Sequence, residues 1–194
     1  MHPYATDSSE RKSVPLYLAT LSIGAAYLLH VTLGNVIPWW IDVPSVIGFY
    51  GLFYLTFERL LWKMRLLRQL GLIRVPNLNG EWSGYLCSSF DGRDGQHAAT
   101  LNIRQNWTQL DISMRAEHSR SSSVIATITT SDPVSRTLSY EYINEPRSDA
   151  IDTMHSHRGT AMADLSTVNG KWILDGEYYT GRDRLNFGTF HFEK

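Results

Sequence analysis

The sequence predicts a membrane α-helical hairpin followed by a small eight-stranded antiparallel β-barrel in the cytoplasm. Two long apolar segments near the N-terminus, residues 14–37 and 43–62, indicate the hairpin. From Pro76 onward, apolar residues alternate with polar ones, which is the pattern of strands with one buried face. A chain of 194 residues has room for one such domain and its membrane anchor.

The two apolar segments have the length of membrane spans. Residues 14–37 contain no charged residue, and residues 43–62 are apolar except for Glu58 and Arg59. Each is close to the ~20 residues that a helix needs to cross a bilayer. The first segment lacks a small-residue cleavage site and a second follows at once, which argues against a removable signal peptide. A buried helical hairpin of a soluble protein is the alternative.

The basic residues that flank these segments predict their orientation. They are Arg11 and Lys12 before the first segment and Lys63, Arg65, Arg68 and Arg74 after the second. The linker PWWID between the segments has no basic residue, so the positive-inside rule places both termini in the cytoplasm. Residues 1–75 are therefore expected to form an N-terminal tail, two transmembrane helices and a connecting helix, and residues 76–194 the cytoplasmic domain.

Glu58 and Arg59 lie near the inner end of the second segment. Charges this close to the interface cost little, so Arg59 can extend to the headgroups while Glu58 pairs with a nearby cation. The alternative is that Glu58 faces another helix and fixes a contact between subunits.

The cytoplasmic domain divides into eight alternating runs separated by polar or glycine-rich turns. These runs are residues 79–90, 97–106, 109–117, 121–130, 136–144, 157–167, 171–181 and 185–193. Eight strands joined as hairpins can close into a barrel, which leaves no exposed edge. A two-sheet sandwich is the alternative.

Alternation also predicts which side chains point into the barrel. Many of them are small: Gly80, Gly84, Gly159, Ala161, Ala163, Gly176 and Gly188. Glycine permits the kinks that close a barrel, and a missing side chain can also leave room for a ligand. The inward polar residues that we expect to gather at one end are Gln105, Asn144, Thr180 and Arg182.

Such an end would combine groups that bind a nucleotide. Guanidinium groups suit phosphate oxygens, aromatic rings stack on bases, and hydroxyls and amides bind ribose or base edges. The candidate ligand-binding residues are Trp82, Arg120, Ser122, Tyr140, Tyr142, Asn144, Tyr178, Thr180, Arg182 and Arg184. In this interpretation Arg182 and Arg184 address phosphates, the tyrosines face bases, and Gly176 leaves space for them.

Other functions find less support in the sequence. The chain after residue 75 holds more acidic than basic residues, which argues against a DNA or RNA polymer as partner. No catalytic motif is present, so we expect no enzymatic activity. His155 and His157 could share one face but lack a third ligand, so we expect neither a metal nor a cofactor. The lone Cys87 is expected to be a packing residue.

An ordered series of segments points to a known family. They are PNLNGEWSGYL (Pro76 to Leu86) with Ser88, LNIRQNWTQLDI, SRSSS, LSYEYINEP, HRGTA, and LDGEYYTGRDR followed by GTF. Together with the hairpin anchor, the series resembles the two-transmembrane β-barrel effectors of bacterial CBASS anti-phage signalling, which are CD-NTase-associated cyclic-nucleotide receptors. The resemblance covers the whole chain, although no single motif is as specific as a metal-ligand set.

The resemblance implies a function as well as a fold. In that family a nucleotidyltransferase activated by infection makes a cyclic dinucleotide, the cytoplasmic barrel binds it, the receptors oligomerise, and the bacterial inner membrane is disrupted. It implies a cyclic dinucleotide as the ligand here. Two other classes remain open from the residues alone. One is a membrane-tethered lipocalin-like carrier of a lipid or other small apolar ligand, and the other is a structural adaptor with a solid barrel.

Overall fold

The computed structural model describes residues 1–33, 39–92, 95–131, 136–151, 154–181 and 185–194, and it describes residues 33 and 39–44 by backbone alone. The chain forms two compact units. One is Ser8–Arg74, and the other joins Met1–Asp7 to Val75–Lys194.

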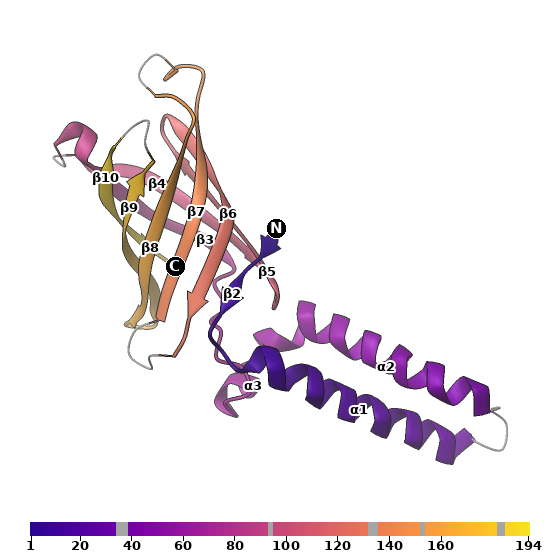
Figure 1. The fold of residues 1–194 in the computed structure, drawn as a ribbon. Coiled ribbons are helices and arrows are strands. Elements are labelled where there is room, and N and C mark those ends of the chain that lie inside the picture. Colours follow the sequence, from indigo (N-terminus) through magenta and orange to yellow (C-terminus); the bar gives the residue numbers. More distant parts are fainter. Residues whose placement is uncertain (34–38, 93–94, 132–135, 152–153, 182–184) are drawn as a thin grey trace. The chain divides into compact units, whose positions relative to one another are not determined.

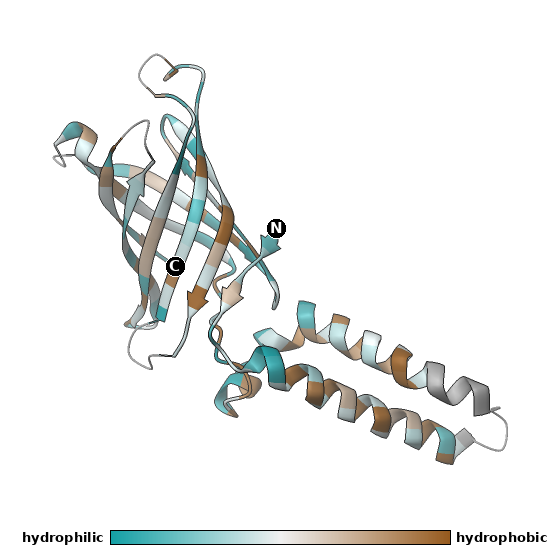
Figure 2. Ribbon diagram, viewed as in Figure 1, coloured by the Kyte–Doolittle hydropathy of each residue, from teal (hydrophilic) through white to brown (hydrophobic). Residues whose placement is uncertain are grey.

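The first unit contains the helices. Helix α1 spans Glu10–Leu33 and α2 spans Trp39–Arg59, and the two lie side by side (Figure 1). Apolar residues occur along most of α1 (Figure 2). Among the residues that the structure describes, one helix, Glu10–Thr32, is long and apolar enough to cross a membrane.

The segment after α2 differs from the continuous connecting helix that the sequence indicated. A 3₁₀ helix, η1 (Leu61–Lys63), is followed by the short α3 (Arg65–Gln69). The break lies at Met64, whose backbone is extended with φ −66° and ψ 132°. Gly71 follows α3 with a left-handed backbone, φ 70°, which glycine adopts without steric cost and which ends the helical stretch.

Eight strands of the second unit form a closed antiparallel barrel. They are β3 (Gly80–Ser88), β4 (His97–Gln105), β5 (Gln109–Ala116), β6 (Ser119–Thr129), β7 (Arg136–Pro146), β8 (His157–Val168), β9 (Lys171–Thr180) and β10 (Phe187–Glu193). Each strand pairs with the next, and β10 pairs back with β3. The predicted fold class is thus confirmed, and the two-sheet sandwich is excluded.

The predicted alternation of inward side chains is confirmed by the barrel core. Every second residue of β4 and β7 is buried, from Ala99 to Gln105 and from Leu138 to Asn144. The fully buried large side chains of the barrel include Trp82, Leu101, Ile103, Leu110, Ile112, Ile128, Leu138, Leu174 and Phe192.

Two very short strands at the N-terminus complete the wall between β5 and β6. Strands β5 and β6 pair directly with each other only over Ser113–Arg115 and Arg120–Ser122. Beyond that point β1 (His2–Pro3) pairs with β5, and β2 (Ala5–Thr6) pairs with β6 in parallel. We refer to residues 1–7 in this position as the seam segment.

Side chains also fix the seam segment in the wall. Tyr4 is buried, and its hydroxyl donates to the carbonyl of Trp107 at 2.8 Å. The Asp7 carboxylate accepts from the backbone N–H groups of Thr130 at 2.7 Å and Ser131 at 2.8 Å. The sequence grouped these residues with the helices, because strands of two residues are too short to show alternation.

Candidate ligand-binding cavity

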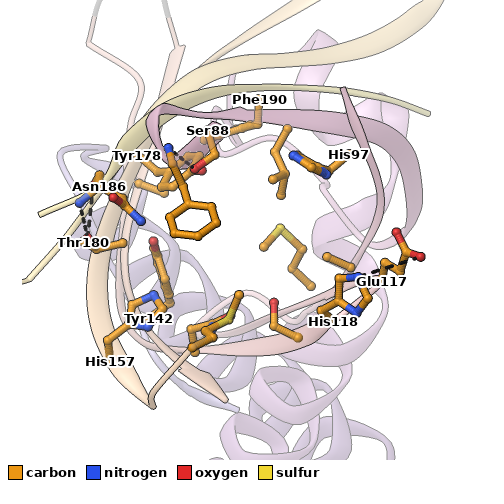
Figure 3. A pocket seen from close by; sticks show the side chains of 18 of the residues that line it. Ser88, His97, Glu117, His118, Tyr142, His157, Tyr178, Thr180, Asn186 and Phe190 are labelled. Atoms are coloured by element: carbon orange, nitrogen blue, oxygen red, sulfur yellow. Dashed lines mark hydrogen bonds and ion pairs between the residues drawn. The ribbon is translucent and has the colours of Figure 1, made fainter. Parts of the chain in front are cut away.

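The barrel holds a cavity of about 250 Å³ at one end. We call this the open end, where β3 meets β4, β5 meets β6, β7 meets β8 and β9 meets β10. The opposite end, where β3 begins and β4 meets β5, is the closed end. Figure 3 looks into the cavity and shows side chains from several strands pointing toward its centre.

Aromatic side chains form much of the wall. Tyr140 and Tyr142 follow each other on the inner face of β7, with ring centroids 6.1 Å apart and planes inclined at 53°. Tyr178 on β9 and Phe190 on β10 line the same cavity (Figure 3). Burial raises the pKa of Tyr140, so its hydroxyl stays protonated and neutral at physiological pH.

The glycines facing the interior allow this close packing. A Cβ on Gly159 would collide with the ring of Tyr142. One on Gly176 would lie 2.6 Å from Cζ of Phe190 and 2.7 Å from Cα of Ala163. The space above Gly176, which the sequence assigned to a ligand, is therefore filled by Phe190.

Polar groups of the cavity are partly committed to the fold. The Thr180 hydroxyl donates to the carbonyl of Asn186 at 3.0 Å and accepts from its N–H at 2.8 Å (Figure 3). The buried Asn144 amide donates to the sulfur of Met154 at 3.4 Å. Both line the cavity as predicted, but Thr180 holds β9 to the start of β10.

Three histidines that the sequence reasoning did not choose as ligand contacts surround the opening. Nε2 of His97 lies 2.6 Å from a carboxylate oxygen of Asp91. Nδ1 of His157 lies 2.9 Å from the carbonyl oxygen of His155. His118 is more exposed, with Nδ1 3.8 Å from Asp149. All three line the cavity.

Comparison with known proteins assigns both parts of the chain. A protein-family model described as "Cap15, cyclic dinucleotide receptor domain" matches residues 73–194, and one described as "Cap15, TM helices" matches residues 12–63. This chain belongs to the Cap15 family. The CBASS resemblance drawn from the sequence is thereby confirmed.

Two curated Cap15 relatives are similar over most of the chain. "CD-NTase-associated protein 15" of Yersinia aleksiciae is 30% identical over 146 residues, which are 73% of this chain and 65% of the relative. The protein of the same name from Staphylococcus schleiferi is 26% identical over 145 residues, or 74% and 75% of the two chains. The matched part of the Yersinia protein is thus just under two thirds of its length.

Within this Cap15 barrel, the structure brings together only some of the residues predicted to bind ligand. Tyr140, Tyr142, Asn144, Tyr178 and Thr180 line the cavity. Arg182 and Arg184 lie outside the described residues. Glu58 and Arg59 lie at the end of α2, where the side chain of Glu58 is half-buried and that of Arg59 is exposed.

Three predicted residues lie elsewhere in the barrel. Trp82 is fully buried toward the closed end, where its indole N–H donates to the Leu78 carbonyl at 3.0 Å. Arg120 points outward and pairs with Glu145 at 2.8 Å. Ser122 is exposed, because the register of β6 turns Ser121 inward instead.

The prediction that Gln105 lies at the same end of the barrel as Asn144 and Thr180 is wrong. Its amide oxygen accepts from the N–H of Leu78 at 2.8 Å, and its amide nitrogen donates to the Pro76 carbonyl at 3.2 Å, both at the closed end. Neighbouring strands run in opposite directions, so β4 ends where β7 and β9 begin. Because neighbouring strands are antiparallel, β4 and β8 both begin at the open end, and His97 and His157 therefore lie there.

The two histidines at 155 and 157 lie in different surroundings. Among the described residues, no group of three His, Cys, Asp or Glu side chains is placed to hold a metal ion. His157 lines the cavity, whereas the side chain of His155 is exposed.

Proposed function

We propose that this chain is a membrane-anchored receptor and effector, which binds a cyclic dinucleotide in the barrel cavity, oligomerises, and disrupts the bacterial inner membrane. The observation that carries the proposal is the aromatic cavity within the segment that matches a cyclic dinucleotide receptor domain. A CD-NTase-type nucleotidyltransferase would supply the ligand, and the chain itself would carry out no reaction.

The cavity wall suits a nucleobase. Base stacking on an aromatic side chain contributes about 1–3 kcal/mol per base and tolerates any base. Tyr178 and Phe190 line the same cavity as Tyr140 and Tyr142, so an inserted base has several aromatic rings available in the wall. The neutral Tyr140 hydroxyl can donate to a base edge.

The size of the cavity supports a binding mode in which the rest of the ligand lies at the opening. Small-molecule sites usually enclose about 300–1,000 Å³, and this cavity of about 250 Å³ is slightly smaller. A molecule of two nucleotides would thus be enclosed only in part, with its phosphates near the rim. Arg182 and Arg184 follow Thr180 in sequence and remain candidates, beside other groups at the rim, for contacts to the phosphates, although they lie outside the described residues.

The effector step would use the membrane anchor. We propose a multi-pass protein of the inner membrane with both termini in the cytoplasm, as the flanking basic residues indicate. Tethering in a plane raises the effective concentration of neighbouring chains, so modest contacts formed on ligand binding can assemble many hairpins. Glu58 and Arg59 at the end of α2 are our candidates for such helix contacts.

The test uses the whole 194-residue chain in detergent. Thermal unfolding would be measured with cyclic di-AMP, cyclic di-GMP, cyclic di-UMP, cyclic UMP–AMP and a set of fatty acids. A compound at 100 times its dissociation constant stabilises the native state by about 2.7 kcal/mol. A shift with one or two cyclic dinucleotides supports the receptor, and no shift with any of them contradicts it.

Two adjacent tyrosines of β9 offer a matched pair of variants for the same assay. Tyr178→Ala removes a ring from the cavity and should weaken cyclic dinucleotide binding about tenfold or more, given the value of ~1–3 kcal/mol per stacked base. Tyr179→Ala removes an exposed ring on the outer face and should leave affinity unchanged. Equal affinity in both variants would exclude stacking on Tyr178.

A carrier of small apolar ligands is a second candidate function. It is favoured by the many apolar lining residues, including Leu86, Met114, Met154 and Ala161. A thermal shift with fatty acids and none with cyclic dinucleotides would support this alternative.

A further inference from the structure

The histidines at the open end can change the number of hydrogen bonds that they donate, because each imidazole ring has two nitrogens that can carry a proton. A neutral imidazole has one N–H donor and one acceptor nitrogen, and only the imidazolium ion donates from both. Which nitrogen carries the proton is set by the partner of the other one.

The contact of His157 fixes its tautomer. Its Nδ1 lies 2.9 Å from the backbone carbonyl oxygen of His155, and a carbonyl oxygen can only accept a hydrogen bond. Nδ1 therefore carries the proton, and Nε2 of the neutral ring is an acceptor. Nε2 can donate to an anionic oxygen only after the ring has taken up a second proton.

In His97 the contact fixes the other tautomer, with the proton on Nε2, and again leaves one ring nitrogen as an acceptor. Its Nε2 lies 2.6 Å from the Asp91 carboxylate, which also only accepts. Nδ1 is then the acceptor nitrogen of the neutral ring. With Nε2 held by Asp91, a proton added at Nδ1 would make the His97 ring a donor at both nitrogens.

Charge at the opening favours these rings as the partners of an anion. Among the described lining residues there is no lysine or arginine, and Glu117 is the one carboxylate. Beside His118 lie Glu117, Asp149 and Arg147, whose guanidinium donates to the Glu117 carbonyl at 3.5 Å. The tyrosines of the wall carry no charge at neutral pH.

The two histidines also match the two anionic groups of a cyclic dinucleotide in number. Such a molecule carries two phosphodiester anions on opposite edges of one ring of atoms. Figure 3 shows His97 and His157 on opposite sides of the opening, at the starts of β4 and β8. Neither phosphate can accept a hydrogen bond from a nitrogen that is itself an acceptor.

We propose that His97 and His157 bind the two phosphates of the cyclic dinucleotide as imidazolium ions, so that ligand binding takes up protons. This inference rests on the proposed receptor function and specifies the chemistry of the same cavity. The affinity should therefore increase as the pH falls through the neutral range.

The size of the effect is scaled here to imidazole free in water, whose protonated fraction is roughly 25 times larger at about pH 6 than at about pH 8. A contact that requires the protonated ring should weaken binding roughly 25-fold per histidine between these two values.

Isothermal titration of the whole 194-residue chain in detergent tests the proposal, with whichever of the four cyclic dinucleotides binds. Titrations at about pH 6 and about pH 8 bracket the ordinary pKa of histidine. Repeating each in two buffers of different ionisation enthalpy measures proton uptake directly. His97→Gln and His157→Gln should each reduce the proton uptake, because the glutamine amide donates without titrating.

His155→Gln is the matched control, because its exposed side chain lies outside the described cavity lining and its carbonyl is retained. This variant should keep the wild-type proton uptake. Binding with the same affinity at both pH values, or proton uptake that persists in both cavity variants, would overturn this inference alone. Absence of binding at both pH values would overturn the proposed function and this inference with it.

Discussion

The two ends of the barrel are built from the same alternating strands but are filled differently. At the closed end Leu78, Trp82, Leu101 and Leu110 are fully buried. At the open end Leu86, Met114 and Tyr178 pack against the core only in part and surround the cavity. Alternation therefore determines which side chains point inward, while their bulk and hydrogen-bond partners determine which end is solid.

Removing a large, fully buried side chain at the closed end should have the greatest effect on stability. Trp82→Ala is expected to lower the free energy of unfolding by about 3–5 kcal/mol, because it leaves a large cavity in a packed core. Urea unfolding of the whole 194-residue chain in detergent measures this loss. Tyr178→Ala at the open end should cost clearly less, and an equal cost would contradict the contrast between the ends.

The buried amides offer a second comparison between the ends. Gln105→Leu would leave the Leu78 N–H and the Pro76 carbonyl without their amide partner, at a cost of about 1–3 kcal/mol for each buried group left unsatisfied. Asn144→Leu at the open end removes one donor from a weakly accepting sulfur and should cost less. Urea unfolding measures both losses. A larger loss for Asn144→Leu than for Gln105→Leu would contradict the view that buried hydrogen bonds stabilise the closed end more than the open end.

The smallest expected effect concerns Asp7 of the seam segment. Burial alone would raise the pKa of Asp7, but hydrogen bonds from Thr130 and Ser131 outweigh it and lower the pKa. Asp7→Ala should cost about 1 kcal/mol, because solvent weakens bonds to an exposed carboxylate. Glu177→Ala removes an exposed carboxylate from β9 and should be neutral.

The pH dependence of the Asp7 contribution has a defined sign. A folded-state pKa below the unfolded value of about 3.9 means that the stabilisation is complete above that value. It is then lost as the pH falls through the lowered folded-state pKa. The difference in stability between wild type and Asp7→Ala should therefore vanish at strongly acidic pH, and a difference that persists there would contradict the role of the carboxylate.

Most of the barrel could be predicted from the sequence because its signal is local. The strands begin and end close to the predicted positions, and Tyr140, Tyr142 and Tyr178 were correctly expected to face inward. Trp82 and Gln105 were assigned to the ligand end because strand direction was not followed around the barrel. Tracking direction would have moved both away and would have identified His97 and His157.

Other features depend on long-range contacts that leave no local pattern. The seam segment has two strands of two residues each, too short for alternation to show. The tautomers of His97 and His157 depend on oxygens fixed by local turns, and the sequence does not indicate those distances. Arg182 and Arg184 remain predictions, since they lie outside the described residues.

The seam segment also determines the order in which the barrel can be completed during synthesis. Asp7 bonds to Thr130 across a separation of 123 residues, and residues 1–7 are synthesised before either strand that they join. Contacts this distant in sequence form late and slow the folding of a domain. The wall between β5 and β6 can therefore close only after the ribosome has produced the helical segment, Ser8–Arg74, which lies between residues 1–7 and the barrel strands in the sequence. A completed barrel thus requires that the helical segment has already been synthesised.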